Sequence, residues 1–371
     1  KEELFNMIRW WLDKGIDGFR LDAISHVKKD EYSVKATENP FFSPFQNVSG
    51  IEEHLSDLKH VFEEYDIMTV GEASGVTAEE GPEWVGKDGY FDMIFEFDHI
   101  HIWQQEKEGQ LDVLKLKHAL SAWQTSLDGI GWNALYMENH DVPRAVSVFG
   151  DTRPEFWAMS AKAIAMMYFF LQGTPFIYQG QEIGMTNMPF ESIDQVDAVD
   201  SKRLYERLLG FPDYKTREEA LDIIRETTRD NSRTPMQWTS EEYAGFSTQE
   251  PWMITNPNTK TINVEQQEHE PDSILQFYKN MIRIRQINRG LIYGSFKEYL
   301  HEHPQLYVYE RDLEDEQYLI MVNLTESFAD YELPKEADQS WTLLLSNSSN
   351  GNFEKKGTLA PYEACLYKTN N

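Results

Sequence analysis

The chain has 371 residues, 40% of them hydrophobic, which excludes a disordered tail or a short peptide module. Its 34 Lys and Arg residues against 63 Asp and Glu residues give a formal net charge of -29, so the surface would repel nucleic acid and anionic lipid. The single cysteine, Cys365, cannot form an internal disulfide, and no apolar run is long enough to span a membrane. We therefore expect a soluble, cytoplasmic protein whose partners are neither nucleic acid nor a membrane.

The first residues predict a helix that leads into a short strand. Leu4, Ile8 and Leu12 recur at helical spacing, Gly15 stops the helix, and residues 19–22 follow as a strand. The same order then repeats along the chain. Further helices are expected at about 52–65, 116–127 and 154–171, and further strands at 67–70, 93–97, 134–137 and 175–178. Such alternation predicts a parallel α/β sheet.

Two of these helices are preceded by sequences typical of a capping box. Ser49-x-x-Glu52 stands before the helix that contains Leu55 and Leu58, and Thr152-x-x-Glu155 stands before the apolar helix that runs to Leu171. We therefore expect the Ser49 and Thr152 side chains to cap these helices.

Polar side chains follow the carboxyl ends of all five predicted strands. They are Asp22, Glu72, His99, the segment Asn139-His140-Asp141, and Gln179. Because the carboxyl ends of parallel strands lie at one edge, and a barrel carries its active site there, we expect the functional site at this edge.

The regular alternation ends after residue 178. Residues 185–250 form a long polar stretch with two helical segments, at about 202–209 and 217–229, and they predict a wall or lid over the site. One more amphipathic helix is expected at about 274–282. From about residue 295 onwards, short strands alternate with turn residues, which indicates a small antiparallel β domain.

Three acidic groups at this edge of the sheet are candidate catalytic residues. Arg20 stands two residues before Asp22, so both side chains lie on one side of a strand, and the guanidinium would keep the carboxylate ionised as a nucleophile requires. A purely structural Arg–Asp pair would have the same spacing. Glu72 lies between Gly71 and Ala73, small residues that would leave room for a ligand.

The third acidic group is Glu138-Asn139-His140-Asp141, with Arg144 one turn further on. A metal site or a hydrogen-bonded turn would also explain this segment. Three acidic groups at the ends of three strands of one sheet would repel one another, however, and each costs several kcal/mol to bury alone. We therefore favour a functional site over coincidence.

These segments together resemble three of the four signature regions of the α-amylase superfamily of glycoside hydrolases. The matching segments are Gly18-Phe19-Arg20-Leu21-Asp22-Ala23, Val70-Gly71-Glu72-Ala73 and Glu138-Asn139-His140-Asp141. The resemblance implies that Asp22 is the nucleophile, Glu72 the general acid/base, and Asp141 the carboxylate that orients the sugar. It also implies that Arg20 and His140 contact the sugar. We expect neither a cofactor nor a metal ion.

A further segment, Asp230 to Trp238, resembles one typical of exo-acting α-glucosidases, including oligo-1,6-glucosidases. In those enzymes, the arginine matching Arg233 helps to close the pocket around the terminal glucose. An arginine that caps a loop before a proline turn is the structural alternative. The resemblance implies a retaining α-glucosidase that releases glucose from the non-reducing end of short isomalto- or malto-oligosaccharides through a glycosyl-enzyme intermediate.

The preferred linkage is open. Ala23 follows the nucleophile, where the family tends to have Val in enzymes that cut α-1,6 bonds and a smaller residue in those that cut α-1,4 bonds. The surrounding segments resemble oligo-1,6-glucosidases instead. A transglycosylating or isomerising enzyme, a hydrolase of phosphorylated disaccharides, and a non-catalytic fragment or relative are the alternatives. Substrate length and oligomeric state are open as well.

The resemblance also sets the expected fold. The five predicted strands match the fourth to the eighth strand of the family's (β/α)8 TIM barrel, so we expect an α/β barrel that lacks its first three units. Residues 1–293 would form this partial barrel, with the lid-like insertion at about 185–250, and residues 294–371 would form a small antiparallel β-sandwich. Whether such a chain is active by itself is open.

Overall fold

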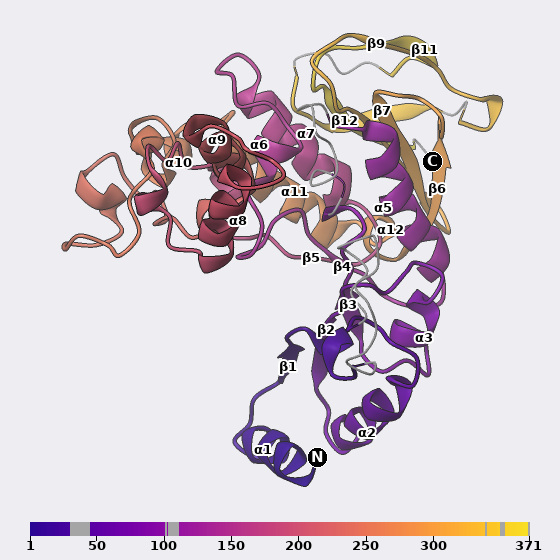
Figure 1. The fold of residues 1–371 in the computed structure, drawn as a ribbon. Coiled ribbons are helices and arrows are strands. Elements are labelled where there is room, and N and C mark those ends of the chain that lie inside the picture. Colours follow the sequence, from indigo (N-terminus) through magenta and orange to yellow (C-terminus); the bar gives the residue numbers. More distant parts are fainter. Residues whose placement is uncertain (30–44, 101, 103–110, 338–339, 349–352, 370–371) are drawn as a thin grey trace. The chain divides into compact units, whose positions relative to one another are not determined.

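The computed structural model of the chain describes residues 1–29, 45–100, 102, 111–337, 340–348 and 353–369. The chain divides into two compact units, and most of their α-helices and strands are labelled in Figure 1. Unit 1 comprises Lys1–Ile102, Lys115–Leu135 and Gln172–Pro175, and unit 2 comprises Trp103–Leu114, Tyr136–Leu171 and Phe176–Asn371.

Unit 1 alternates helices with short parallel strands, as the sequence predicts. Its elements are α1 (Glu2–Leu12), β1 (Gly18–Leu21), the 3-10 helix η1 (Ile24–His26), α2 (Glu52–Phe62), β2 (Met68–Glu72), α3 (Gly81–Val85), β3 (Met93–Phe95), α5 (Val113–Leu127), β4 (Ala134–Leu135) and β5 (Thr174–Pro175). Strands β1, β2 and β3 form one parallel sheet, and β4 and β5 form a parallel pair. Strands β3, β4 and β5 end earlier than predicted.

Local sequence explains how β1 is placed. Gly15 has a φ of 89°, a left-handed conformation that ends α1 without the steric penalty of a side chain. Gly18 opens β1 with a φ of 154°, and a Cβ there would lie 1.8 Å from the Met68 carbonyl oxygen. Only glycine therefore allows β1 and β2 to approach each other at this point.

The core of unit 1 forms because each helix presents one apolar face. In α2, the residues Leu55, Leu58, Val61 and Phe62 recur at helical spacing, and all four are buried. They pack in one cluster with apolar residues of α1, α3 and α5. This packing holds the strands whose ends carry the predicted site.

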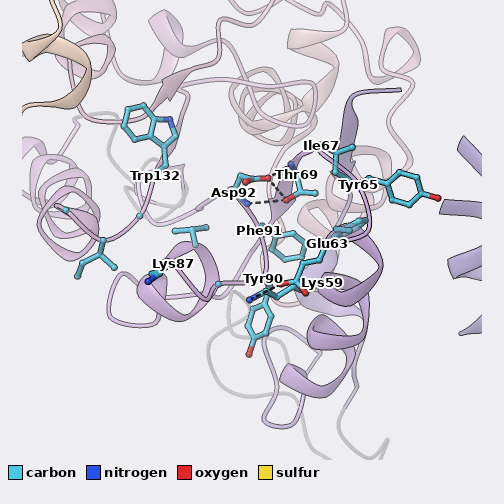
Figure 2. A pocket seen from close by; sticks show the side chains of 17 residues that line it. Lys59, Glu63, Tyr65, Ile67, Thr69, Lys87, Tyr90, Phe91, Asp92 and Trp132 are labelled. Atoms are coloured by element: carbon cyan, nitrogen blue, oxygen red, sulfur yellow. Dashed lines mark hydrogen bonds and ion pairs between the residues drawn. The ribbon is translucent and has the colours of Figure 1, made fainter. Parts of the chain in front are cut away.

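Unit 1 also has a pocket of about 520 Å³ near the amino-terminal ends of β2, β3 and β4 (Figure 2). Its lining includes Thr69 in β2, Asp92 directly before β3, and Trp132 two residues before β4. The pocket therefore lies at the end of these strands opposite to the carboxyl ends.

Unit 2 begins with helices. They are α6 (Ala145–Val148), α7 (Trp157–Phe169), η2 (Gln181–Ile183), η3 (Ile193–Gln195), α8 (Val199–Leu209), α9 (Arg217–Thr227), η4 (Arg229–Ser232), η5 (Glu242–Gly245), η6 (Pro257–Lys260), α10 (Val264–His269), α11 (Ile274–Ile287) and α12 (Gly290–Tyr293). The expected insertion thus contains two α-helices, α8 and α9, which contact each other (Figure 1).

The predicted antiparallel β domain is confirmed. Its elements are β6 (Ser295–Tyr299), β7 (Leu306–Leu313), β8 (Glu316–Asn323), β9 (Ala329–Glu332), η7 (Lys335–Ala337), β10 (Trp341–Ser346), β11 (Lys356–Leu359) and β12 (Ala364–Thr369). One sheet has the order β10-β12-β8-β7-β6, and β9 pairs with β11 in a second. Helix α7 packs on β8 and β12, which explains why both faces of β8 are buried.

The residues at which helices begin were predicted less well than the presence of the helices. The expected capping boxes at Ser49 and Thr152 are wrong, since α2 begins after Ile51 and α7 after Phe156, neither with a side-chain cap. A capping box that was not expected opens α9, where Thr216 and Glu219 bond each other's backbone.

No helix in the described ranges combines the length and the apolar character that crossing a membrane requires. The cytoplasmic location stays a prediction from the sequence.

Candidate active site

Three predicted site residues meet in unit 1, at the carboxyl ends of β1 and β2. Arg20 Nη1 donates to Asp22 Oδ1 at 2.5 Å, and Arg20 Nη2 donates to Glu72 Oε2 at 2.7 Å. The parallel register pairs Arg20 with Val70 and Leu21 with Gly71, so continuing it by one residue brings Asp22 to Glu72. One guanidinium therefore joins the two carboxylates.

The two carboxylates differ in exposure. The Asp22 side chain is 74% exposed, whereas the Glu72 side chain is 15% exposed. Glu72 Oε2 also accepts a hydrogen bond from the Ala23 backbone nitrogen at 3.0 Å. Asp22 is therefore open to a ligand, while Glu72 is held by donors from Arg20 and Ala23.

Ala23 has an unusual backbone. Its φ is 45° and its ψ is 39°, the left-handed region that costs a residue with a Cβ roughly 1–2 kcal/mol. This conformation precedes η1 and directs the Ala23 N–H at Glu72. A strained residue beside the predicted nucleophile is typical of a functional site, where the surrounding fold maintains the strain.

The expected role of the small neighbours of Glu72 is wrong. A Cβ at Gly71 would lie 3.1 Å from both an Ile24 and a Phe91 carbon, and Ala73 is fully buried. The space beside these residues is filled by the core. They are small because the protein packs tightly here, and they leave no room for a ligand.

A second acidic cluster follows β3. Glu96 Oε2 accepts from the Asp98 backbone nitrogen at 2.6 Å, and its other oxygen contacts His99 Nδ1. Trp123 Nε1 donates to Asp98 Oδ2 at 2.8 Å. Loss of solvation and the neighbouring Glu96 raise the pKa of Asp98 to about 6, against the opposing effect of Trp123.

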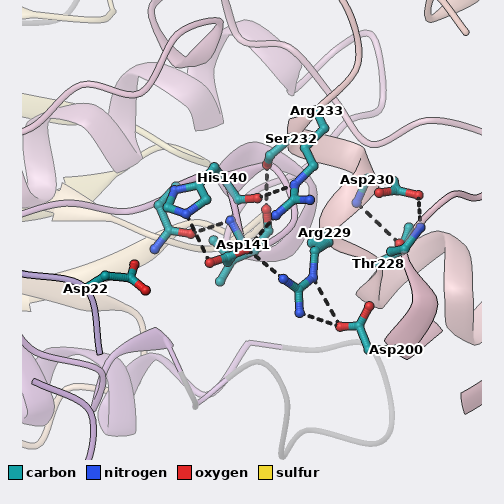
Figure 3. Close-up of polar contacts among 12 residues, drawn as sticks. Asp22, His140, Asp141, Asp200, Thr228, Arg229, Asp230, Ser232 and Arg233 are labelled. Atoms are coloured by element: carbon teal, nitrogen blue, oxygen red, sulfur yellow. Dashed lines mark hydrogen bonds and ion pairs between the residues drawn. The ribbon is translucent and has the colours of Figure 1, made fainter. Parts of the chain in front are cut away.

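The other three predicted site residues meet in unit 2 (Figure 3). Asp141 Oδ1 accepts from Arg233 Nη2 at 2.7 Å, and Asp141 Oδ2 lies 3.1 Å from His140 Nε2. Arg233 Nε also donates to the His140 carbonyl oxygen at 2.9 Å. The sequence segments around Asp141 and Arg233 are thus brought together by direct contacts.

Two residues that the sequence did not single out complete this cluster. Arg229 Nη1 donates to Asp141 Oδ1 at 2.9 Å, and its Nη2 donates to Asp200 Oδ2 at 2.7 Å (Figure 3). Partial burial alone would lower the pKa of Arg229, but Asp200 and Asp141 raise it above its ordinary value. Likewise, burial alone would raise the pKa of Asp200, but Arg229 lowers it. The cluster balances its charges internally.

Beneath Asp141, a buried pair anchors the segment that carries both arginines. Arg144 Nη1 donates to Glu138 Oε1 at 3.0 Å, and both side chains are 1% exposed. Arg144 also donates to the Gln179 carbonyl at 2.7 Å and to the Asn231 and Ser232 carbonyls at 3.3 and 3.4 Å. Burial raises the pKa of Glu138, which Arg144 opposes. Arg144 therefore ties residues 231–232 to Glu138 and Gln179 within unit 2.

A family model described as "Alpha amylase, catalytic domain" matches residues 1–294. The chain belongs to the α-amylase family. It is 44% identical over 380 residues to the probable oligo-1,6-glucosidase 3 of Bacillus subtilis (strain 168), covering 99% of this chain and 68% of that protein. It is also 39% identical over 383 residues to the oligo-1,6-glucosidase of Bacillus cereus, with 99% and 68% covered.

Solved structures of the α-amylase family agree with this. The trehalose-6-phosphate hydrolase of Bacillus licheniformis matches with a TM-score of 0.89 at 35% identity, over 99% of this chain and 68% of that one. The isomaltulose synthase of Klebsiella sp. LX3 matches with a TM-score of 0.90 at 32% identity, over 100% and 68%. The protein is a glycoside hydrolase with an α-amylase catalytic domain and a C-terminal antiparallel sheet domain.

In this α-amylase family member, the predicted residues form two groups. Arg20, Asp22 and Glu72 contact one another in unit 1, and His140, Asp141 and Arg233 do so in unit 2. The missed residue Arg229 stands one position before the recognised segment at 230–238, and Asp200 stands in the first turn of α8. Their charges were visible in the sequence, but only the fold shows that both face Asp141's cluster.

Proposed function

We propose that the protein is a retaining, exo-acting α-glucosidase that releases glucose from the non-reducing end of short α-glucosides. The observation that carries this proposal is the shared Arg20 guanidinium, which holds an exposed Asp22 carboxylate beside a shielded Glu72. Two neighbouring carboxylates are what glycoside hydrolysis requires, and the relatives named oligo-1,6-glucosidases use glucosides as substrates. No cofactor enters the proposal.

Asp22 acts as the nucleophile in this scheme. Its carboxylate attacks the anomeric carbon of the terminal glucose, while Glu72 gives its proton to the departing glycosidic oxygen. Arg20 favours the ionised form of Asp22 and positions it. A glycosyl ester on Asp22 and a free aglycone alcohol result.

Glu72 then acts as the base. The ester on Asp22 removes the negative charge from one of the two groups that Arg20 binds. Glu72, now ionised, takes a proton from water, and the water oxygen attacks the anomeric carbon from the face that the aglycone left. Glucose with its original anomeric configuration leaves, and Glu72 is protonated again.

Asp141 holds the glucose hydroxyls, with His140 beside it and Arg233 and Arg229 behind it. Since both arginines already bind Asp141, the carboxylate is fixed in orientation. We propose that this cluster accepts a terminal glucose, which accounts for exo action. We further propose that residues 1–293 form the barrel part without its first three units, with a lid-like insertion at about 185–250, and that residues 294–371 form the β domain.

For the linkage, the names of the relatives and the residue after Asp22 point to different answers. Relatives named oligo-1,6-glucosidases favour α-1,6 bonds, whereas Ala23 favours α-1,4 bonds. The likeness to an isomaltulose synthase supports an isomerising enzyme as the second candidate. A phosphorylated substrate is less well supported, because Arg229 and Arg233 are both neutralised by carboxylates.

The first experiment measures hydrolysis of para-nitrophenyl α-glucoside, maltose and isomaltose by this chain. Asp22→Asn should abolish turnover, while Asp213→Asn, the same change at an exposed carboxylate in unit 2, should leave it unchanged. The initial product should be α-glucose by NMR; β-glucose would contradict a retaining mechanism. Sucrose, with product analysis for isomaltulose, tests the second candidate.

Azide separates the two carboxylate roles. In Glu72→Ala, azide can attack the glycosyl enzyme without base assistance, so turnover should return and yield α-glucosyl azide. In Asp22→Ala, azide would replace the nucleophile and yield β-glucosyl azide. The opposite pairing of products would reverse the assigned roles. Glu79→Gln, an exposed glutamate of the same unit, is the control.

A further inference from the structure

We propose that the pocket at the amino-terminal ends of β2, β3 and β4 is a second, non-catalytic binding site for a neutral pyranose sugar (Figure 2). Its volume of about 520 Å³ lies within the range of small-molecule sites, roughly 300–1,000 Å³. All residues that line it belong to unit 1.

The pocket is separate from the catalytic carboxylates. Thr69, which lines it, is the second residue of β2, and Glu72 is the last. Three residues of extended strand span about 10 Å, and the pocket lies at the opposite edge of the sheet. A ligand bound here would therefore not be the glucoside undergoing cleavage.

Three half-buried aromatic side chains supply apolar surface. The Tyr65 hydroxyl donates to Asp13 Oδ1 at 2.9 Å, and Trp132 Nε1 donates to Thr174 Oγ1 at 2.8 Å. The Tyr90 ring packs edge-on against Trp84, with centroids 6.1 Å apart. The polar ends of two rings are thus already bonded within the protein. Rings held in this way can stack on the apolar face of a pyranose with little loss of side-chain entropy.

Polar groups at the pocket have bonding capacity left for a ligand. Thr69 donates twice to Asp92 Oδ2, from its backbone nitrogen at 2.6 Å and its hydroxyl at 2.9 Å. Among the described residues, no hydrogen bond reaches Asp92 Oδ1, and no hydrogen bond or ion pair reaches Lys87 Nζ. One fixed acceptor and one donor are therefore available.

The balance of charges favours a neutral ligand. Lys59 and Lys87 line the pocket together with Glu63 and Asp92, so its formal charge is close to zero. A phosphate or another anion would need an excess of donors, and the net charge of -29 opposes it further. Sugar hydroxyls both donate and accept, which suits a site that has an ammonium and a carboxylate.

The test locates binding of isomaltose by amide hydrogen exchange. Asp22→Asn provides a background without turnover. On it, isomaltose should slow exchange at residues 87–92 and 129–132, in addition to any protection at residues 20–23 and 71–73. Inorganic phosphate should not. Protection only at 20–23 and 71–73, protection by phosphate at the pocket, or no protection anywhere would each overturn the inference.

A paired substitution tests the contacts. Lys87→Ala with Asp92→Asn removes the donor and replaces the open acceptor, while the asparagine oxygen can still accept from Thr69. Protection at the pocket should disappear and its calorimetric Kd should rise at least tenfold. The matched pair Lys202→Ala with Asp213→Asn, both exposed and in unit 2, should change neither. Unchanged pocket protection in the first pair would overturn the inference. If the doubly substituted variant does not fold, the same two measurements are made on Lys87→Ala alone, which changes only an exposed side chain.

The outcome is distinguishable from that of the proposed function. Pocket protection without hydrolysis in the wild type would support the second site and count against the glucosidase. Hydrolysis without pocket protection would support the glucosidase and count against the second site.

Discussion

At the scale of single residues, the arginine that joins Asp22 to Glu72 is the feature on which the proposed chemistry depends. Its two terminal nitrogens each bind one carboxylate, at 2.5 and 2.7 Å. A planar guanidinium can serve two acceptors at fixed positions, whereas an ammonium is a single point charge. Arginine is therefore required here for its geometry as well as for its charge.

Arg20→Lys should lower kcat/KM for para-nitrophenyl α-glucoside by about two orders of magnitude, because misplacement of a reacting group by about 1 Å can have an effect of that size. The half-buried Arg9 binds Glu64 through two nitrogens as well, at 2.8 and 2.5 Å, and Arg9→Lys is the matched control. Equal, small effects of both substitutions on kcat/KM would show that the shared guanidinium has no special role.

Asp98 predicts a pH dependence of stability. Its pKa of about 6 lies above the ordinary value, so the folded state binds the proton more tightly than the unfolded chain. The stabilisation that protonated Asp98 gives the folded state is fully present below about pH 4 and is lost as the pH rises through 6. Asp98→Asn lacks this titration but can still accept from Trp123.

The free energy of unfolding, measured with urea, should therefore shift in favour of Asp98→Asn between pH 4.5 and 7.5. Comparing the variant with the wild type at each pH cancels the titration of all other groups. A difference that is constant, or that favours the wild type at the higher pH, would contradict the raised pKa.

At the scale of elements, the segment 229–233 owes its position to Arg144. This one side chain binds Glu138 and three carbonyl groups, and the Ser232 hydroxyl adds a bond to the Val142 carbonyl. The short η4 helix could not hold its arginines on Asp141 by its own stability. Buried polar contacts replace the apolar packing that a longer helix would have.

Arg144→Met should destabilise the protein by about 3–5 kcal/mol, because Glu138 would remain buried without its cation. Adding Glu138→Leu should restore part of this stability, since the pair of charges is then absent. Activity should not recover with it, because the Asn231 and Ser232 carbonyls still lack their donor. Urea midpoints and kcat of the wild type and of the two variants measure both effects. Parallel recovery of stability and kcat would disprove the positioning role.

Sequence reasoning located elements better than their ends. Apolar spacing placed α2 and α5 correctly, because packing of one face determines such helices. The expected capping boxes at Ser49 and Thr152 are wrong, because such four-residue motifs also occur where the chain turns before a helix begins. Strands β4 and β5 are only two residues long, since their ladder depends on a partner that no local pattern reveals.

The same division holds for the site. Asp22 directly follows β1 and Glu72 ends β2, so the parallel register alone brings these two carboxylates together. Arg229 comes from η4 and Asp200 from α8, and their contact spans 29 residues of sequence. Nothing local distinguishes these two side chains from solvated surface charges.

At the scale of the whole molecule, the excess of acidic residues dominates. The 63 Asp and Glu residues against 34 Lys and Arg residues give a net charge of -29, so exposed carboxylates repel one another in the folded state. Added salt screens this repulsion, with a Debye length of about 8 Å at physiological ionic strength.

The Tm should accordingly rise by ~2–4 °C as NaCl is raised from a few millimolar to about 0.15 M, the shift that about 1 kcal/mol produces in a domain of 150–250 residues. Scanning calorimetry at pH 7 measures it. A Tm that falls or stays constant would mean that attractive ion pairs outweigh the repulsion.

The backbone at Ala23 bears on how the specificity of such an enzyme can change. In the proposed scheme Ala23 follows the nucleophile, a position where the resemblance to the family associates Val with cleavage at α-1,6 bonds, yet its φ of 45° is a conformation that β-branched residues avoid. Ala23→Val would therefore lower stability in the same step that, under this proposal, changes the bond that is cleaved. The exchange is therefore open only to sequences that already carry a margin of stability from substitutions elsewhere, so the order of mutations is constrained.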